Sequence, residues 1–410
     1  MASYDLGGEA FFADPDPTFR AMRERDPVYW SPELEAWVLT RYEDVRRALR
    51  DGRLGAGTNS RVRAASPPRV EAKLRECFRF LSTWMIFRDP PAHARLRAAV
   101  GRAFAPGAVA GLAPFVRARV GEALSAALGR GRLDVVRDLA YPLTAATSAR
   151  FVGVPPDLVP DLLRWSADVF LLFGAGAESE EVVEAAHRSL VACRARMREV
   201  LAARGPGPAD DLMGRLAGAP GADGALGEDE IIGTCVMLMI GGHETTAHLI
   251  GNGLLALLRH GAERRKLAAR PDLLDAAVEE LIRYDGPSVS VVRRAREDVA
   301  FGGATVRAGQ YVFAVLRSAN RDPAAFADPD RLDVERSDNR HLGLGHGIHF
   351  CVGATLARLQ AKAAIGELLG RLPGLALEEG ARLRWLPSLA TRGLESLPVT
   401  FRAARPSGGG

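Results

Sequence analysis

The segment from Gly345 to Gly353 constrains this chain most, because it places one cysteine among three glycines directly before a predicted helix. Glycine allows tight backbone turns and lets a ligand approach the backbone closely. A sulfur at a helix N-terminus faces free N–H groups and the positive end of the helix dipole, and both favour thiolate. The segment therefore predicts a single metal-bound thiolate at Cys351, with a buried, inert cysteine as the alternative.

The remaining cysteines and the overall charge exclude several classes of protein. Cys77, Cys193 and Cys235 are scattered and form neither a zinc motif nor a disulfide framework, so we expect inert thiols in a reduced, cytoplasmic chain. The N-terminus has no signal-peptide pattern, and the most apolar stretch, residues 231–240, is too short to span a bilayer. Lys plus Arg number 54 against 50 Asp plus Glu. That small excess predicts no nucleic-acid partner, and we expect no membrane association.

The spacing of apolar residues predicts a mainly α chain with a smaller β-rich part, an α+β fold. We expect one domain over residues 1–405 and a disordered tail at 406–410. The expected elements are a hairpin over 27–40, helices over 42–49, most of 92–203, 211–216, 228–260, 272–285 and 353–370, strands within 289–316, and a long irregular segment over 318–350.

A second motif, residues 240–246, lies in the middle of the long predicted helix. Two adjacent glycines and two threonines weaken one helical turn, so we expect a groove or bulge there. Glu244 and Thr245 place an acid beside an alcohol, which can relay protons into an apolar pocket. Close helix packing at the glycines is the alternative.

Two further motifs are pairs of charged residues on single helix faces. Glu280 and Arg283 are three residues apart and predict a helical ion pair, which alone means no more than a solvated pair. His93 and Arg97 are four residues apart and can clamp an anionic group, with ordinary surface charge as the alternative.

In this order and spacing, the four motifs resemble those of the cytochrome P-450 superfamily, haem-thiolate monooxygenases, in its soluble bacterial type. The resemblance covers almost the whole chain, from the 28–40 hairpin to Arg392-Gly393-Leu394. It implies the cytochrome P-450 fold, a triangular prism-like helical domain around a buried haem b. It also implies insertion of one oxygen atom of O2 into a small molecule.

The resemblance also implies roles for individual residues. Cys351 is the proximal thiolate, which pushes electron density onto iron and favours O–O cleavage. Propionates are bound by four side chains, with Arg294 competing for the place of Arg293. The expected haem-binding residues are His93, Arg97, Gly241, Arg293, His349, Cys351 and Gly353.

Glu244 and Thr245 match the pair that delivers protons to iron-bound dioxygen, which favours an oxygen-activating enzyme over a peroxide-using one. Glu280, Arg283 and Arg331 match a structural network behind the thiolate loop. Two positions depart from the usual pattern. Leu344 replaces a common Phe, which can alter packing at the sulfur, and Gly241 replaces a common Ala, which leaves room above the iron.

Position in the motifs also suggests a mainly apolar substrate lining, in which flexible Met residues adapt to shape. For each lining residue, core packing is the alternative. The candidates are Trp84, Met85, Met237, Ile240, Val289, Ser290, Val291 and Leu394.

A lining without charge favours a largely apolar substrate, such as a polyketide macrolide or a terpenoid natural product. The resemblance, with the intact Glu244–Thr245 pair, implies its hydroxylation or epoxidation. Fatty-acid hydroxylation is an alternative substrate class, and oxidative coupling or desaturation on the same haem are alternative reactions. A non-enzymatic haem-thiolate sensor or carrier-binding scaffold is a further alternative.

The electron supply is expected to come from other proteins, because no flavin or iron–sulfur module fits within 410 residues beside this fold. NAD(P)H would deliver electrons through a ferredoxin reductase and a ferredoxin. Ferredoxins are usually acidic, so Arg102, Arg340 and Arg358 are candidates to dock one. We expect a monomer.

Overall fold

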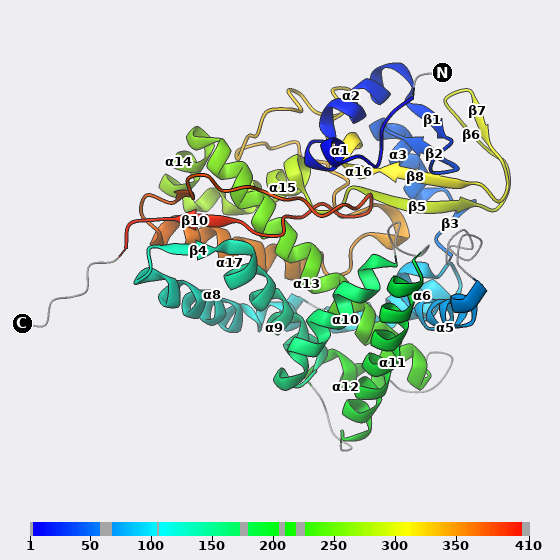
Figure 1. Ribbon diagram of the computed structural model, residues 1–410, viewed down its shortest axis with the longest axis horizontal. Coiled ribbons are helices and arrows are strands. Elements are labelled where there is room, and N and C mark those ends of the chain that lie inside the picture. Colours follow the sequence, from blue (N-terminus) through cyan, green and yellow to red (C-terminus); the bar gives the residue numbers. More distant parts are fainter. Residues whose placement is uncertain are drawn as a thin grey trace, which may run out of the picture. The chain divides into compact units, whose positions relative to one another are not determined.

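The computed structural model describes residues 3–57, 68–104, 106–172, 179–204, 210–218 and 226–403 (Figure 1). The described residues form two compact units. The larger comprises Met1–Leu54, Ala113–Thr144 and Glu244–Gly410, and the smaller comprises Gly55–Leu112 and Ala145–His243. The boundary between His243 and Glu244 falls inside the longest helix, α13 (Glu228–Arg259). The predicted tail at 406–410 lies outside the described residues.

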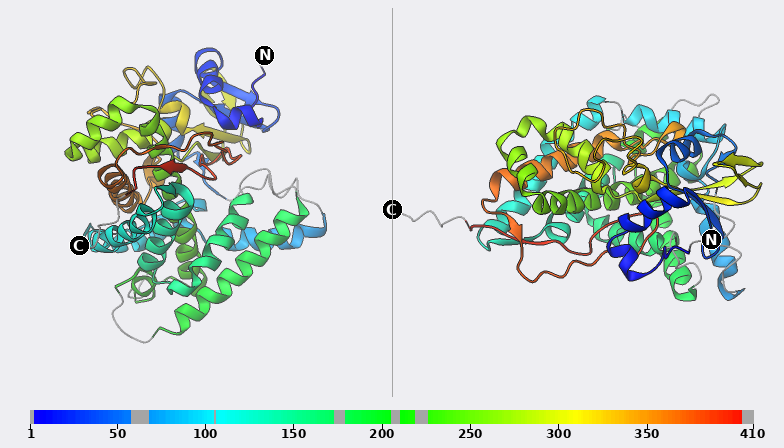
Figure 2. Two further views of the ribbon diagram at one scale, coloured as in Figure 1. Left: turned by 60° about the vertical axis from the view of Figure 1, so that its left-hand side comes forward. Right: turned by 90° about the horizontal axis from the view of Figure 1, so that it is seen from above.

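The larger unit contains a five-stranded sheet in the order β1-β2-β8-β5-β3. Its N-terminal hairpin pairs β1 with β2 antiparallel, which confirms the predicted hairpin, and β2 pairs parallel with β8. The blue N-terminal strands therefore lie beside the yellow strands of the later chain (Figures 1 and 2). The strands are β1 (Val28–Ser31), β2 (Ala36–Leu39), β3 (Leu54–Gly55), β5 (Ser290–Ala295) and β8 (Tyr311–Val315).

Two smaller sheets complete the β structure of this unit. The strand β10 (Pro398–Thr400) lies between β4 (Arg132–Asp134) and β9 (Ala376–Leu377). A separate hairpin joins β6 (Val299–Phe301) to β7 (Ala304–Val306).

The helices of the larger unit include most of those that the apolar spacing predicts. The short helices α1, α2 and α16 and the charged helix α14 were not predicted; α14 buries only Leu267 and so lacks an apolar stripe. The helices are α1 (Glu9–Ala13), α2 (Asp16–Arg25), α3 (Tyr42–Arg50), α8 (Ala113–Leu128), α14 (Gly261–Ala269), α15 (Leu274–Asp285), α16 (Leu316–Ala319) and α17 (Ala354–Arg371).

The smaller unit is helical, as the spacing over 92–203 predicts. The helix α9 begins in the larger unit at Tyr141 and continues into this one. The helices are α5 (Glu71–Leu81), α6 (Ala92–Ala103), α7 (Pro106–Ala110), α9 (Tyr141–Val152), α10 (Val159–Leu171), α11 (Glu180–Ala202) and α12 (Leu212–Ala217).

The core of the larger unit holds together the elements that carry the motifs. Val116, Val120 and Leu124 recur every four residues on α8, so they form one buried stripe. They belong to a cluster that also includes Leu254 of α13 and Ile365 of α17. The C-terminal half of α13 and the helix after Cys351 therefore share one apolar core.

The described helices were also assessed as membrane spans. Within the described ranges no single helix is long and apolar enough to cross a bilayer. The bent pair Ala92–Ala103 and Gly107–Leu128 together has the length and composition of a broken span.

Candidate active site

The backbone around Cys351 is folded back on itself by glycines. The Cys351 N–H donates to the carbonyl of Leu344 at 2.9 Å. Gly345 and Gly347 both have φ of +73°, a region that side chains disfavour. A Cβ at Gly347 would lie 2.9 Å from the Leu49 carbonyl oxygen, so this position has no room for a side chain.

Cys351 is half-buried, whereas Cys77, Cys193 and Cys235 are buried, and all four are free thiols. Burial raises the pKa of Cys77 and of Cys193 to about 12 and raises that of Cys235 as well, so these thiols stay protonated. The expectation that these three cysteines are buried is thus confirmed. An accessible sulfur in a glycine-shaped loop fits a haem thiolate, and that role remains a prediction.

A buried network stands behind the loop. Arg283 donates to both carboxyl oxygens of Glu280, at 2.7 and 2.8 Å, and both side chains are 0% exposed. This confirms the predicted ion pair and shows that it is not solvated. Arg283 also donates to the Asn320 carbonyl at 2.9 Å, and the Asn320 side chain accepts the N–H of Leu342 at 2.7 Å. The network therefore reaches Leu342, in the irregular segment that precedes the Cys351 loop.

The prediction that the Arg331 side chain is the third member of this network was wrong. The Arg331 side chain is exposed, and only its carbonyl takes part, accepting from Arg283 at 3.1 Å. The guanidinium of Arg336 instead donates to both oxygens of Glu280, at 3.1 and 3.2 Å. The residues between them form an irregular segment, so spacing along the chain could not identify which arginine turns inward.

Glu244 brings an unusual carboxyl group into α13. Its Oε2 is shielded from solvent and accepts no hydrogen bond from any residue that the structure describes. Burial raises the pKa of Glu244 to about 7. A carboxyl that titrates near neutral pH is suited to taking up and releasing protons, and the half-buried Thr245 follows it directly.

The two glycines before Glu244 differ in their surroundings. A Cβ at Gly242 would lie 3.1 Å from Ser148 Oγ, which is close packing, whereas a Cβ at Gly241 would meet no heavy atom within 4 Å. The room expected at Gly241 is therefore present. The predicted bulge is absent, because α13 is a continuous α-helix through residues 240–246.

The propionate candidates lie in both units. In the larger unit, Arg293 of β5 is buried while the neighbouring Arg294 is exposed, so burial favours Arg293 between the two. His349 is half-buried at the end of a short 3₁₀ turn. In the smaller unit, α6 carries a buried His93 and a half-buried Arg97 on one face. Burial and the charge of Arg97 lower the pKa of His93.

The substrate-lining candidates of the smaller unit are all buried: Trp84, Met85, Met237 and Ile240. A Cβ at Gly233 of α13 would lie 3.6 Å from Trp84 Cδ1, so the indole packs beside the N-terminal half of that helix.

The candidates of the larger unit are more firmly packed. Val289 belongs to a hydrophobic cluster with Phe11 and Phe19, and Leu394 belongs to the main core, which is the alternative that the sequence left open. The Ser290 hydroxyl donates to the Leu389 carbonyl at 2.6 Å, and Val291 is half-buried.

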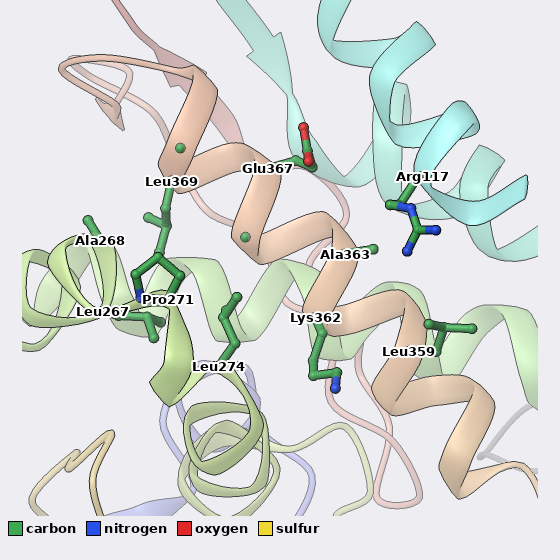
Figure 3. A pocket seen from close by; sticks show the side chains of 12 residues that line it. Arg117, Leu267, Ala268, Pro271, Leu274, Leu359, Lys362, Ala363, Glu367 and Leu369 are labelled. Carbon is green, nitrogen blue, oxygen red and sulfur yellow. The ribbon is translucent and has the colours of Figure 1, made fainter. Parts of the chain in front are cut away.

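A groove of about 430 Å³ opens elsewhere in the larger unit, between α8, α14, α15 and α17 (Figure 3). Leu267, Pro271 and Leu274 line one side of it and Leu359 and Ala363 another. None of the predicted site residues lines this groove.

The arginines proposed for docking differ in their partners. Arg358 donates to both oxygens of Glu279, at 2.6 and 2.7 Å, so its charge is already paired. Burial raises the pKa of Glu279, but hydrogen bonds from Arg358 and His341 outweigh this effect and lower the pKa to about 2. Arg340 is exposed and pairs with Asp338 at 3.1 Å, and Arg102 is exposed.

Comparisons with known proteins give consistent matches. The family model "Cytochrome P450" matches residues 169–373. The chain is 37% identical over 371 residues to mycinamicin IV hydroxylase/epoxidase of Micromonospora griseorubida, covering 90% of each. It is 31% identical over 402 residues to the polyketide biosynthesis cytochrome P450 PksS of Bacillus subtilis, covering 96% of this chain and 97% of that one. A crystal structure of the myxobacterial cytochrome P450 CYP267B1 with myristic acid superposes with a TM-score of 0.87 at 37% identity, covering 97% and 98%.

Proposed function

This chain belongs to the cytochrome P450 family, and on that basis we propose that Cys351 is the thiolate ligand of its haem iron. The enzyme is a haem-thiolate monooxygenase whose cofactor is haem b, and its electrons come from NAD(P)H through separate redox proteins. The accessibility of Cys351 among buried cysteines and the glycine-shaped loop around it support this assignment. When bound, the haem supplies the activation of O2.

Four side chains are proposed to bind the haem propionates: His93, Arg97, Arg293 and His349. Buried carboxylates need such partners, because an unpaired buried charge is costly. The buried position of Arg293 and the shared face of His93 and Arg97 support these assignments.

The observation that carries the proposed activity is the buried Glu244 carboxyl directly before Thr245. Its raised pKa, about 7, lets it hold a proton at neutral pH and release it to an acceptor. The Thr245 hydroxyl is proposed to pass that proton to the reacting oxygen, so that O–O cleavage is coupled to substrate oxidation rather than to peroxide release.

Replacing Thr245 with Val tests this role, because Val keeps the shape and removes the hydroxyl. With a reconstituted ferredoxin system, the product formed per NADPH should fall by roughly threefold or more, with a matching rise in peroxide. Thr246→Val is the control, since this buried neighbour has no proposed role and should keep its coupling. Unchanged coupling in Thr245→Val would contradict the proposed proton transfer.

The substrate is proposed to be a largely apolar natural product, of the polyketide macrolide or terpenoid class, that is hydroxylated or epoxidised. The buried apolar residues Trp84, Met85, Met237 and Ile240 and the open position at Gly241 support this class. The named roles of the mycinamicin and polyketide relatives support it further. Fatty-acid hydroxylation is a second candidate, favoured by the myristic acid in the similar CYP267B1 structure.

A spin-state titration separates these two substrate classes. Substrate that displaces water from ferric haem shifts the Soret band, so macrolide aglycones and free fatty acids can be compared on the same holoenzyme. We expect saturable shifts with macrolide-type ligands at lower concentrations than with myristate. If myristate instead gave the shift at lower concentration, fatty acids would replace macrolides as the proposed substrate class. In either case, oxygenated product should form from the ligand that binds more tightly.

The electron donor, oligomeric state and cellular location of the enzyme are also proposed. A ferredoxin with its reductase supplies the electrons, with exposed arginines such as Arg102 and Arg340 available to an acidic donor. The protein acts as a monomer in the cytoplasm, and its four free cysteines agree with a reducing compartment. Residues 1–405 are proposed to work as one haem-enclosing domain.

A further inference from the structure

Glu279 directly precedes the buried Glu280 on α15, and its carboxyl group has partners of its own. Arg358 of α17 donates to both of its oxygens, at 2.6 and 2.7 Å. His341 Nε2 lies 3.1 Å from Oε2 of the same carboxyl group. The sequence motifs assign no role to Glu279 or to His341.

The two partners of Glu279 lie on opposite sides of Cys351 along the chain. His341 precedes the cysteine, near the end of the irregular segment. Arg358 follows it, in the second turn of α17. One carboxyl group of α15 therefore binds the chain both before and after the loop that carries the proposed thiolate.

On the side of His341, a few hydrogen bonds lead from the carboxyl group to the backbone of Cys351. Leu342 directly follows the histidine, and its carbonyl accepts the N–H of Gly345 at 2.8 Å. The carbonyl of Leu344 accepts the N–H of Cys351 at 2.9 Å. The position of His341 therefore bears directly on the turn that places the sulfur.

The contacts of Glu279 are stronger than those of an ordinary surface pair. The His341 side chain is 4% exposed, and the side chains of Glu279 and Arg358 are about one-third exposed. The pKa of Glu279, about 2, keeps its carboxyl group ionised, so it only accepts and His341 Nε2 carries the hydrogen. Bidentate arginine–carboxylate geometry adds strength and a fixed direction.

Another buried imidazole of the larger unit has a different kind of partner. The His248 ring packs against the C-terminal segment, where a Cβ at Gly393 would lie 2.2 Å from its Cδ2. Its Nε2 lies 3.0 Å from the Tyr141 hydroxyl. The partner of His248 is thus a phenol, whereas that of His341 is an ionised carboxyl group, which is a stronger acceptor.

The same carboxyl group also fixes a positive charge near the sulfur. Its hydrogen bond is the main reason why the pKa of Arg358 is raised, and the charge of Cys351 contributes less. The Arg358 cation is therefore close enough to Cys351 to interact with it electrostatically. Charges and hydrogen bonds outside a ligand set orient the ligands and tune the metal.

We propose that Glu279 is a positioning residue that clamps both sides of the Cys351 loop, through His341 and Arg358. The clamp fixes where the thiolate lies and how much net charge lies beside it. This proposal rests on the proposed role of Cys351 as the haem thiolate. Glu279 and His341 act through the loop, since neither is placed against the haem or the substrate.

The charge beside the thiolate is tested by the ferric–ferrous reduction potential of the holoenzyme. Glu279→Gln leaves the Arg358 cation uncompensated, which favours the more negative ferrous site, so the potential should rise. Arg358→Gln leaves the carboxylate uncompensated, so the potential should fall. At a fixed applied potential, the ferrous-to-ferric ratio should change by about threefold to tenfold, in opposite directions. A loop that is merely loosened would shift both variants in the same direction.

The position of the thiolate is tested in the ferrous–CO form, whose Soret band reports whether the sulfur is bound as thiolate. In dilute urea, His341→Leu should shorten the lifetime of the thiolate-type band by about threefold to tenfold, the effect of losing one hydrogen bond. His341→Gln retains an N–H donor and should recover part of that lifetime. Neither measurement requires turnover.

A second ion pair between the same two helices provides a matched control. Lys362 Nζ donates to Asp275 at 2.5 Å, one helical turn from Arg358 on α17 and one turn from Glu279 on α15. Asp275→Asn and Lys362→Gln remove an interhelical charge pair of the same kind outside the clamp. Both should keep the ferrous-to-ferric ratio and the band lifetime within about twofold of wild type.

The outcomes separate the clamp from the role of Cys351 itself. If the wild-type ferrous–CO form lacks the thiolate-type band, the proposed ligand is wrong and the clamp fails with it. If the band is present but the Glu279 and Arg358 variants do not shift the potential in opposite directions, or His341→Leu keeps the wild-type lifetime, the clamp is overturned and the thiolate stands. If the control variants change both measurements as strongly, the effect is one of helix packing and the clamp is again wrong.

Discussion

Glu244 holds a carboxyl group in an environment that disfavours its charge. The pKa of about 7 means that the folded protein keeps this proton over a pH range in which the unfolded chain has lost it. Between about pH 4.5 and pH 7 the free energy of unfolding therefore falls as pH rises, because the unfolded state binds fewer protons. The same burial that suits Glu244 to proton transfer thus makes the fold less stable at neutral pH.

Replacing Glu244 with Gln should remove this pH-dependent loss. Relative to wild type, the variant should gain up to about 3 kcal/mol in the free energy of unfolding between pH 5 and pH 8. Urea unfolding of the holoenzyme at both pH values measures this difference.

Glu279→Gln is the control with the opposite sign. The pKa of Glu279 is lowered to about 2, so its ionised form stabilises the fold above the unfolded pKa and this contribution is lost only in acid. The variant should be less stable by the same amount at pH 5 and at pH 8. A pH-independent difference in Glu244→Gln would contradict the assigned burial of that carboxyl.

At the scale of elements, the buried Glu280–Arg283 pair of α15 holds the irregular segment that precedes the Cys351 loop. α15 supplies Glu280 and Arg283, and the loop before α17 supplies Cys351. Helical backbone groups satisfy each other, but residues 320–346, between α16 and the 3₁₀ turn before Cys351, form no helix or strand. Some of their carbonyls instead accept hydrogen bonds from Arg283 and Arg336, so these two guanidinium groups supply donors that a neighbouring strand would supply in a sheet.

Replacing Arg336 with Ala should therefore weaken the whole segment. Glu280 would lose one charged donor in a fully buried site, which costs about 2–3 kcal/mol. We expect a lower urea midpoint and faster loss of haem from Arg336→Ala. Arg331→Ala should stay within about 0.5 kcal/mol of wild type, since its side chain is exposed. If both substitutions lowered stability equally, the sequence-based prediction that Arg331 belongs to the Glu280–Arg283 network would be supported instead.

At the scale of the whole molecule, the long regular elements, the paired motifs and the existence of the irregular segment were predictable, but the side-chain contacts within that segment were not. Apolar periodicity predicted α13 and α17 to within a few residues, and the i, i+3 spacing predicted the Glu280–Arg283 pair. Helices such as α14 escaped because their stability comes from contacts with distant elements rather than from an apolar stripe.

The candidate site shows the same division. Positions within a motif, such as Cys351, Glu244 and Thr245, were predicted from local spacing in the sequence, and their roles remain proposals. Arg336 could not be predicted in this way, because it contacts Glu280 from a segment far along the chain.

The contact between His248 and Gly393 also bears on how this chain can evolve. A side chain at position 393 would occupy the space of the imidazole, so that ring would have to move and give up Tyr141. We therefore expect a side chain at 393 to be tolerated better when residue 248 is smaller than histidine. Two positions separated by more than a third of the chain are thus expected to constrain each other's substitutions.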